Sequence, residues 1–292
     1  MQEAVPLKKY KIRSPAKINL FLHIMGKRPD GYHNIISLIC GVGLYDTLQF
    51  TFNTKILSVS CAHPLVPEDK TNLVFLAARL FLDKTGKNES FEIILHKQIP
   101  VGAGLGGGSS NAASVLLFLN KYYHYPFSID ELIRMGASLG SDVPFFIFQK
   151  PAIVSGTGEK ISSFDHLGQL FALIIYPGFS LSTSMVYKEF DLGLTNNKKK
   201  VIHSISDYTY LDLRFNLFNK LHNDLEDIVF SKYPEIYKVK KVLLDNGAES
   251  ALMTGSGSAV FGLFSDLGAA KKAKRSISRY DKWQIYLSEL LV

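Results

Sequence analysis

The sequence has few of the features that mark secreted, membrane-bound or disulfide-stabilised proteins. It has only two cysteines in 292 residues, Cys40 and Cys61, and they match no metal-binding or redox spacing. This argues against a disulfide scaffold and predicts a reducing compartment, the cytoplasm. No apolar run is long enough to cross a bilayer, and the first residues, MQEAVPLKKYKIRS, lack the apolar core of a signal peptide. We therefore expect no membrane partner.

The sequence also lacks a concentrated excess of one charge. Its formal net charge is +7 at pH 7, but its 33 Lys and Arg residues are scattered among 26 Asp and Glu residues. The two dense basic runs, at 198–200 and 271–275, are interpreted as a loop and a solvated helix face. This balance suits phosphate-bearing ligands better than nucleic acid. A non-catalytic nucleic-acid-binding protein is the alternative from another functional class.

Glycine is abundant in one place. Residues 100–113 read PVGAGLGGGSSNAA and follow an apolar, β-branched stretch at 91–99 that predicts a strand. Residues 111–123 carry apolar side chains at helical spacing. Glycine lets a ligand approach the main chain closely, and the unpaired N–H groups at a helix start attract anions. We predict a nucleotide-phosphate loop, with a tight turn that holds no ligand as the alternative.

This loop lacks the signatures of the common nucleotide-binding loops. It does not end in G-K-[ST], which argues against a Walker loop. No H-R-D or D-F-G follows, which argues against a protein kinase. Gly102, Gly104 and Gly107 fit G-x-G-x-x-G, but they lie a third of the way along the chain. The acidic residue at a possible distance, Asp130, precedes a predicted helix rather than ending a strand, so a dinucleotide fold fits poorly.

A lysine and an asparagine share one face of a predicted strand near the N-terminus. Apolar residues alternate with other residues over 17–24, and Lys17 and Asn19 fall on the face opposite the apolar one. The pair could reach a phosphate or a hydroxyl. An ordinary solvent-facing pair is the alternative, and alternation alone favours it.

Residues 26–33, GKRPDGYH, form a predicted loop that ends in an aromatic and a histidine. Tyr32 could stack on a nucleobase, and polar groups beside it could read the edge of that base. The alternative is a tyrosine that closes a hydrophobic edge. His33 by itself is more typical of a hydrogen-bonded structural residue.

An aspartate follows the helix that is predicted from residue 129. Ser128 and Glu131 form a capping box for that helix, and Gly140 can terminate it. Pro144 favours extended backbone at the residue before it, which predicts a helix-to-strand junction at Asp142. A carboxylate beside an apolar segment could act as a general base if a lysine kept it ionised. A capping or turn aspartate is the alternative.

Three motifs in order resemble those of the GHMP small-molecule kinases. They are PAKIN at 15–19, the glycine stretch at 100–113 and TGSG at 254–257. Within that family, RPDGYH at 28–33, NLV at 72–74 and GSDVP at 140–144 are most similar to members that act on a cytidine diphosphate-linked methylerythritol. The resemblance implies an α+β fold with an S5-like, ATP-binding catalytic domain over 1–160. It also implies a ferredoxin-like, substrate-covering domain over 161–292.

The resemblance implies ATP-dependent phosphorylation of the 2-hydroxyl of that small molecule, in the non-mevalonate route to isoprenoids. Asp142 is implied as the general base, with Lys17 orienting it and stabilising negative charge, and Asn19 positioning the substrate. ATP and Mg²⁺ are the implied cofactors. The implied phosphate loop comprises Pro100, Val101, Gly102, Ala103, Gly104, Leu105, Gly106, Gly107, Gly108, Ser109 and Ser110.

The resemblance also implies how the base is recognised. Tyr32 stacks on cytosine, His33 hydrogen-bonds to it and Tyr187 covers its other face. Ser258 stands where a proline is expected in the third motif, which leaves the detail of that turn open. The alternative within the family is a homoserine, mevalonate or sugar kinase. We expect a monomer or a weak homodimer, and no nucleic-acid partner.

Overall fold

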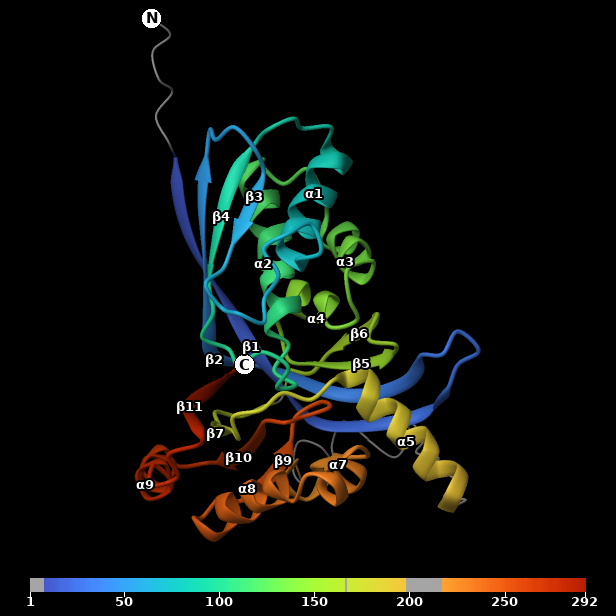
Figure 1. Ribbon diagram of the computed structural model, residues 1–292, viewed down its shortest axis with the longest axis vertical. Coiled ribbons are helices and arrows are strands. Elements are labelled where there is room, and N and C mark those ends of the chain that lie inside the picture. The colour runs from blue at the N-terminus through green and yellow to red at the C-terminus, as the bar shows by residue number, and fades with distance from the viewer. Residues whose placement is uncertain (1–7, 166, 198–216) are drawn as a thin grey trace, which may run out of the picture. The chain divides into compact units, whose positions relative to one another are not determined.

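The computed structural model describes residues 8–165, 167–197 and 217–292 (Figure 1). The chain divides into two compact units, and each unit is built from separate stretches of sequence. The first comprises Met1–Ala16, Leu44–Val101 and Gly106–Gln149, and the second comprises Lys17–Gly43, Gly102–Leu105 and Lys150–Val292. The units therefore interleave along the chain, whereas the sequence predicted a single boundary after residue 160. That boundary stays a prediction.

The first unit places helices on one side of a small sheet (Figure 1). Residues 47–52 of β2 (His33–Phe52) pair antiparallel with β4 (Phe91–His96), which pairs parallel with β3 (Ser58–Ser60). The helices of this unit are α1 (Leu73–Thr85), α2 (Gly107–Tyr122), α3 (Ile129–Ala137) and α4 (Val143–Phe148).

Aromatic packing holds α2 on this sheet. The ring centroids of Phe118 in α2 and Phe50 lie 4.3 Å apart. The Tyr122 ring stacks on that of Phe52, with centroids 4.1 Å apart. Burial of large aromatic side chains contributes strongly to such packing. The far end of α2 is thus fixed, which positions the glycine-rich start of the same helix.

The segment around Asp142 differs from the sequence prediction. The capping box of Ser128 and Glu131 is confirmed, but α3 ends at Ala137 with Ser138 as its C-cap, before Gly140. The predicted extended residue after Asp142 is wrong, because α4 begins there at Val143. Proline is tolerated in the first turn of a helix, where its missing N–H has no helical partner to lose.

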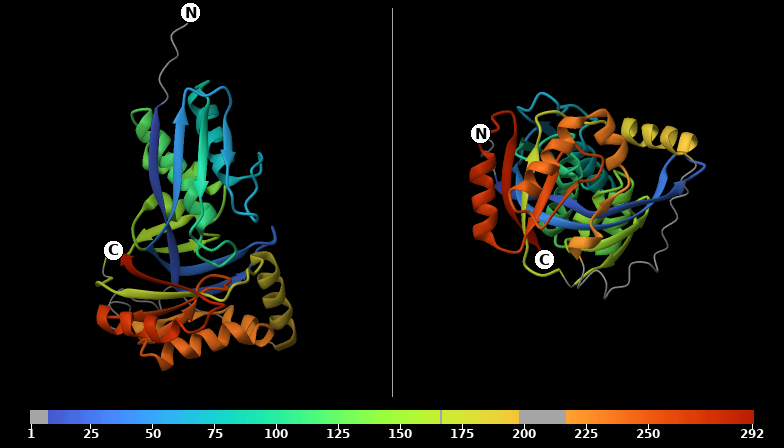
Figure 2. Two further views of the ribbon diagram at one scale, coloured as in Figure 1. Left: turned by 60° about the vertical axis from the view of Figure 1, so that its left-hand side comes forward. Right: turned by 90° about the horizontal axis from the view of Figure 1, so that it is seen from below.

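The second unit contains a sheet with two helices packed on one face (Figure 2). In this sheet β7 (Phe171–Tyr176) pairs antiparallel with β10 (Val260–Phe264) and β11 (Gln284–Leu291), and β10 pairs antiparallel with β9 (Ser250–Met253). The predicted strand, glycine turn and strand over 251–264 are confirmed. The two helices are α8 (Pro234–Asp245) and α9 (Leu267–Ile277).

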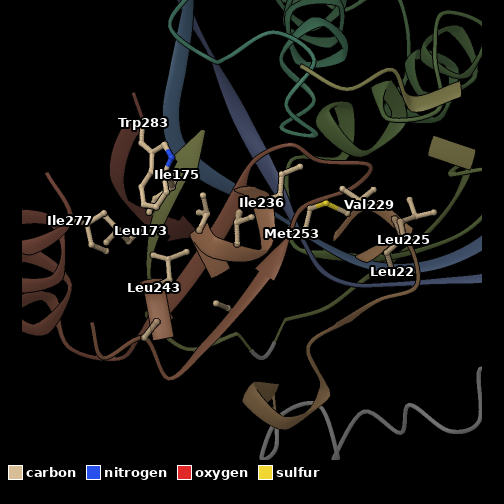
Figure 3. Packing of buried hydrophobic residues seen from close by; sticks show 14 of the residues in the cluster. Leu22, Leu173, Ile175, Leu225, Val229, Ile236, Leu243, Met253, Ile277 and Trp283 are labelled. Carbon is tan, nitrogen blue, oxygen red and sulfur yellow. The ribbon is translucent and has the colours of Figure 1, made fainter. Parts of the chain in front are cut away.

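A continuous hydrophobic core lies beneath these helices (Figure 3). Leu173 and Ile175 of β7 contribute to it, as do Leu243 of α8 and Ile277 of α9, all fully buried. The remaining elements of this unit are part of β1 (Lys9–Lys27), part of β2, β5 (Ala152–Gly156), β6 (Lys160–Ser163), α5 (Thr183–Asn197), β8 (His222–Asn223) and α7 (Glu226–Lys232). Among the described helices, none combines the length and the hydropathy needed to span a bilayer.

Candidate active site

Lys17 and Asn19 lie on β1 in the second unit, and both are buried, with 4% and 2% of their surface exposed. Lys17 Nζ donates to Asn19 Oδ1 at 2.6 Å, and Asn19 Nδ2 donates to Ser37 Oγ of β2 at 2.8 Å. The interpretation as a solvent-facing pair is therefore wrong. A buried ammonium requires polar or negatively charged surroundings, so this position suits contact with an anion.

The third motif meets this pair within the same unit. Thr254 Oγ1 donates to Asn19 Oδ1 at 3.2 Å and accepts from the Asn19 N–H at 3.1 Å. A Cβ built on Gly255 would lie 3.4 Å from Lys17 Nζ. Gly104 has φ +77°, and a Cβ there would lie 2.1 Å from the Thr254 carbonyl oxygen, so only glycine fits. Three motifs that are distant in sequence thus converge.

Asn223 supports the third motif, a role that no sequence pattern indicated. It is buried, and its Nδ2 donates to the carbonyl oxygens of Met253 and Gly255, both at 2.8 Å. Ser258, in place of the expected proline, is also buried and donates through Oγ to the Phe179 carbonyl oxygen. The serine is therefore accommodated by a hydrogen bond that proline could not make.

The predicted phosphate loop is divided between the units. Pro100 and Val101 belong to the first unit, residues 102–105 to the second, and residues 106–110 to the first. In the second unit the Leu105 carbonyl oxygen accepts from the Lys17 N–H at 3.0 Å. The Gly102 carbonyl oxygen accepts from the Leu181 N–H at 3.0 Å. These bonds fix the middle of the loop.

Helix α2 begins earlier than the sequence predicted. Its N-cap is Gly106, with φ 68°, and Gly107, Gly108, Ser109 and Ser110 form the first turn. The N–H groups of a first turn have no acceptor within the helix, and the helix dipole adds partial positive charge there. Ser110 is fully buried and its Oγ lies 2.7 Å from Ser14 Oγ. This end of the helix has the properties of an anion site.

A buried ion pair lies beside the start of α2. It was not predicted from the sequence. Asp46 is fully buried and pairs with Lys97 Nζ. Asp46 Oδ1 accepts from the N–H groups of Gln98 and Ile99 at 2.7 and 2.9 Å, and Oδ2 accepts from Asn111 Nδ2 at 3.0 Å. The carboxylate thus joins the chain entering the loop to the start of α2.

We expect Asp46→Ala to lower the free energy of unfolding by about 3–5 kcal/mol, because Lys97 is left buried without its counter-ion. Denaturant titration measures this loss. The matched control is Asp83→Ala, whose exposed pair with Arg79 (Asp83 Oδ1 3.1 Å from Arg79 Nε) contributes less than about 1 kcal/mol. Equal losses in the two variants would contradict the structural role of Asp46.

Asp142 lies in the first unit at the start of α4, with helical backbone angles of φ −87° and ψ −13°. Among the described residues, its carboxylate accepts no hydrogen bond from the first turn of α4, so it does not cap that helix. A Cβ on Gly140 would lie 3.8 Å from Ser109 Oγ, which places the 140–142 segment beside the first turn of α2. Lys17 belongs to the other unit, and its pairing with Asp142 stays a prediction.

His33 and Tyr187 come together in the second unit. Their ring centroids lie 5.0 Å apart, and His33 is buried while Tyr32 is 67% exposed. Asp191, one helical turn after Tyr187 on α5, lies 2.7 Å from His33 Nε2 and 2.6 Å from Lys27 Nζ. Burial alone would raise the pKa of Asp191, but hydrogen bonds from Lys27 and His33 lower it overall. Asp191 was not predicted from the sequence. Its position four residues after Tyr187, on the same face of a helix, was the signal that could have identified it.

Comparison with known proteins places these motifs in a family. The model of the GHMP kinases N-terminal domain matches residues 72–150, and that of the GHMP kinases C-terminal region matches residues 211–282. The chain belongs to the GHMP kinase family. The two-domain α+β fold expected for this family is thereby confirmed. GHMP kinases are ATP-dependent kinases of small molecules, so ATP is a substrate of this one.

Individual GHMP kinases are similar over nearly the whole chain. The 4-diphosphocytidyl-2-C-methyl-D-erythritol kinase of Syntrophus aciditrophicus (strain SB) is 40% identical over 277 residues, covering 94% of this chain and 97% of the relative. The enzyme of that name from Geobacter sp. (strain M21) is 39% identical over 278 residues, covering 95% and 97%. A crystal structure of 4-(cytidine 5'-diphospho)-2C-methyl-D-erythritol kinase superposes with a TM-score of 0.80 at 30% identity, covering 97% of this chain and 100% of that one.

Proposed function

We propose that this GHMP kinase transfers the γ-phosphoryl group of ATP to the 2-hydroxyl of 4-diphosphocytidyl-2-C-methyl-D-erythritol, in the non-mevalonate route to isoprenoid precursors. The observation that carries the proposal is the similarity, over nearly the full length, to relatives with that activity in their names. The cytoplasmic location and the monomeric or weakly dimeric state stay predictions.

The first turn of α2 and the glycine loop before it are the proposed site for the ATP phosphates. Phosphoryl transfer requires in-line positioning and neutralisation of charge, with little covalent chemistry from the protein. Main-chain N–H groups at the start of α2 supply part of this neutralisation. Mg²⁺ bound with the nucleotide would supply the rest of the charge neutralisation.

Asp142, Lys17 and Asn19 are the proposed residues at the acceptor hydroxyl. Asp142 takes the proton as the hydroxyl attacks, and the Lys17 ammonium stabilises the negative charge that develops. The hydrogen bonds from Lys17 to Asn19 and from Asn19 to Ser37 hold the two side chains in a fixed orientation. Fixed donors need no reorganisation at the moment of transfer.

Asp191 is the proposed positioning residue for recognition of the base. With its lowered pKa it is ionised at neutral pH and acts only as an acceptor, so His33 Nε2 carries the hydrogen between them. In the neutral imidazole, Nδ1 is then an acceptor. Such an acceptor matches the 4-amino group of cytosine and leaves the 4-oxo group of uracil unpaired.

Turnover of the cytidyl substrate with ATP and Mg²⁺, followed by ³¹P NMR, tests the proposal. We expect one phosphorylated product, with slower turnover of the uridine analogue. Homoserine, mevalonate and galactose are the comparison substrates, and turnover of one of these without the cytidyl substrate would assign the chain to another GHMP activity. Salt-sensitive oligonucleotide binding with no kinase activity would support the non-catalytic alternative.

We expect Tyr32→Ala to raise KM for the cytidyl substrate about tenfold, because stacking on an aromatic ring contributes ~1–3 kcal/mol per base. KM for ATP changes little. Initial-rate kinetics in both substrates measure the two constants. Tyr125→Ala is the control, since Tyr125 is 66% exposed against 67% for Tyr32. Equal effects on the two KM values would count against stacking.

A further inference from the structure

Three metal-ligating side chains gather in the second unit and have no part in the proposed reaction. His23 lies on β1, and His222 and Asp224 lie at and just after β8. One ligand atom from each residue lies within 4.8 Å of the others. The His23 side chain is 2% exposed and the Asp224 side chain 5%, whereas that of His222 is 51% exposed. Two members of the cluster are therefore buried, and the third, His222, is accessible to solvent.

Hydrogen bonding orients the carboxylate toward both imidazoles. Asp224 Oδ2 accepts from the Ile24 N–H at 2.6 Å, which fixes the plane of the carboxylate. Its other oxygen, Oδ1, lies 2.7 Å from His222 Nε2 and 3.7 Å from His23 Nδ1. Outer contacts of this kind, which hold one oxygen and direct the other, accompany carboxylate ligands in metal sites.

The charges of the cluster favour a cation. The Asp224 carboxylate, with its side chain 5% exposed, is the acidic member of the cluster. A buried carboxylate thus lies beside two imidazoles, and these are side chains that bind Zn²⁺.

We propose that His23 Nδ1, His222 Nε2 and Asp224 Oδ1 bind a divalent transition-metal ion of the Zn²⁺ class, with water as the fourth ligand. Tetrahedral zinc with bonds of ~2.0–2.1 Å sets ligand atoms about 3.4 Å apart. The distances of 2.7 and 3.7 Å around Oδ1 bracket that value. The hydrogen between His222 and Asp224 leaves Nε2 on binding, either to the other ring nitrogen or to solvent.

The donor set separates this ion from the Mg²⁺ expected with ATP. Magnesium prefers oxygen ligands and retains several waters, whereas two imidazoles with one carboxylate suit zinc. The proposal is therefore independent of the proposed kinase reaction.

A metal bound at this cluster would stabilise the conformation of the third motif, residues 254–257. His222 and Asp224 flank Asn223, whose side chain bonds to the carbonyl oxygens of Met253 and Gly255. Strand β8 pairs with β1 over only two positions, with Phe21 opposite His222 and Leu22 opposite Asn223. An ion shared by His23, His222 and Asp224 would link the short strand β8 to β1 and hold Asn223 in place.

Isothermal titration calorimetry with zinc at pH 7.5 tests the site. The full chain is first treated with a chelator, which is then removed. We expect one equivalent to bind, with millimolar Mg²⁺ unable to displace it. At ~100 times Kd, zinc should raise the thermal midpoint by roughly 5 °C. His222→Gln should weaken binding ~100-fold or more, since loss of even an outer contact costs 10–100-fold. His63→Gln is the matched control and should leave the affinity unchanged.

Two results would overturn the proposal: no stoichiometric zinc binding, or a His222→Gln variant that binds as tightly as the unsubstituted chain. A second measurement does not depend on any variant folding. Co²⁺ bound to the unsubstituted chain should give the intense visible bands of a tetrahedral site, and their absence would also overturn it. Affinity should fall as the pH is lowered from 7.5 to about 5.5, because protons compete with the metal for its ligand atoms, and a pH-independent affinity would contradict imidazole ligands.

Discussion

We expect Asp142→Asn to lower kcat by about 10³-fold while ATP still binds, because the amide keeps the shape of the side chain but cannot serve as the general base of the proposed reaction. General-base catalysis of this kind contributes ~10²–10⁴-fold. Stopped-flow or steady-state kinetics give kcat, and nucleotide titration gives the Kd for ATP. The loss should fall on kcat rather than on KM, since a general base acts in the transition state.

Asp130→Asn is the control for this prediction. Asp130 is an exposed carboxylate in the first turn of α3, within the same compact unit as Asp142. Its replacement should leave kcat within about twofold, because it removes a surface charge of small energetic effect. Turnover near normal in Asp142→Asn would assign the proton transfer to another group.

We expect Lys17→Met to lower kcat by about 10²–10³-fold, the range for removal of one donor that stabilises charge in a transition state. Methionine has a similar length and no charge, and the position is 4% exposed. Methionine removes the cost of burying the ammonium, and Asn19 Oδ1 still accepts a hydrogen bond from Thr254 Oγ1. The thermal midpoint should therefore stay near that of the unsubstituted chain, which separates a catalytic loss from a folding defect.

The matched control is Lys160→Met, an exposed lysine on β6 in the same unit. It should change neither kcat nor the thermal midpoint measurably. If Lys17→Met unfolds the chain, Lys17→Arg provides a second test, because it keeps the charge but displaces it and should recover only part of kcat. Full activity in either Lys17 variant would contradict its role in charge stabilisation.

Local sequence patterns predicted the helices and strands well where the cause of each element is local. The capping box at Ser128 and Glu131 depends on residues three apart, and the structure contains it. The turn between β9 and β10 was predicted from its glycines and is present. The Asp142 junction was predicted wrongly, because Pro144 was read as keeping the preceding residue extended. Proline is equally compatible with the second position of a helix.

The order and content of the three motifs sufficed to identify the family and to select candidate residues. A motif can be recognised in a sequence because its residues are consecutive. Its backbone conformation also restricts the residue type, as the positive φ at Gly104 does. These features are sufficient for the GHMP resemblance. The roles of Lys17 and Asp142 rest on that resemblance and on the experiments above.

Only the tertiary structure shows which side chains the candidate residues contact. Alternation along β1 marked Lys17 and Asn19 as polar, but whether that face meets water depends on β2 and on the third motif, which are remote in sequence. The contacts of Asp46 with Lys97, of Asp191 with His33, and of His23 with Asp224 join positions 51, 158 and 201 residues apart. Periodicity reports only neighbours within a few positions, so burial and long-range pairing depend on the folded chain.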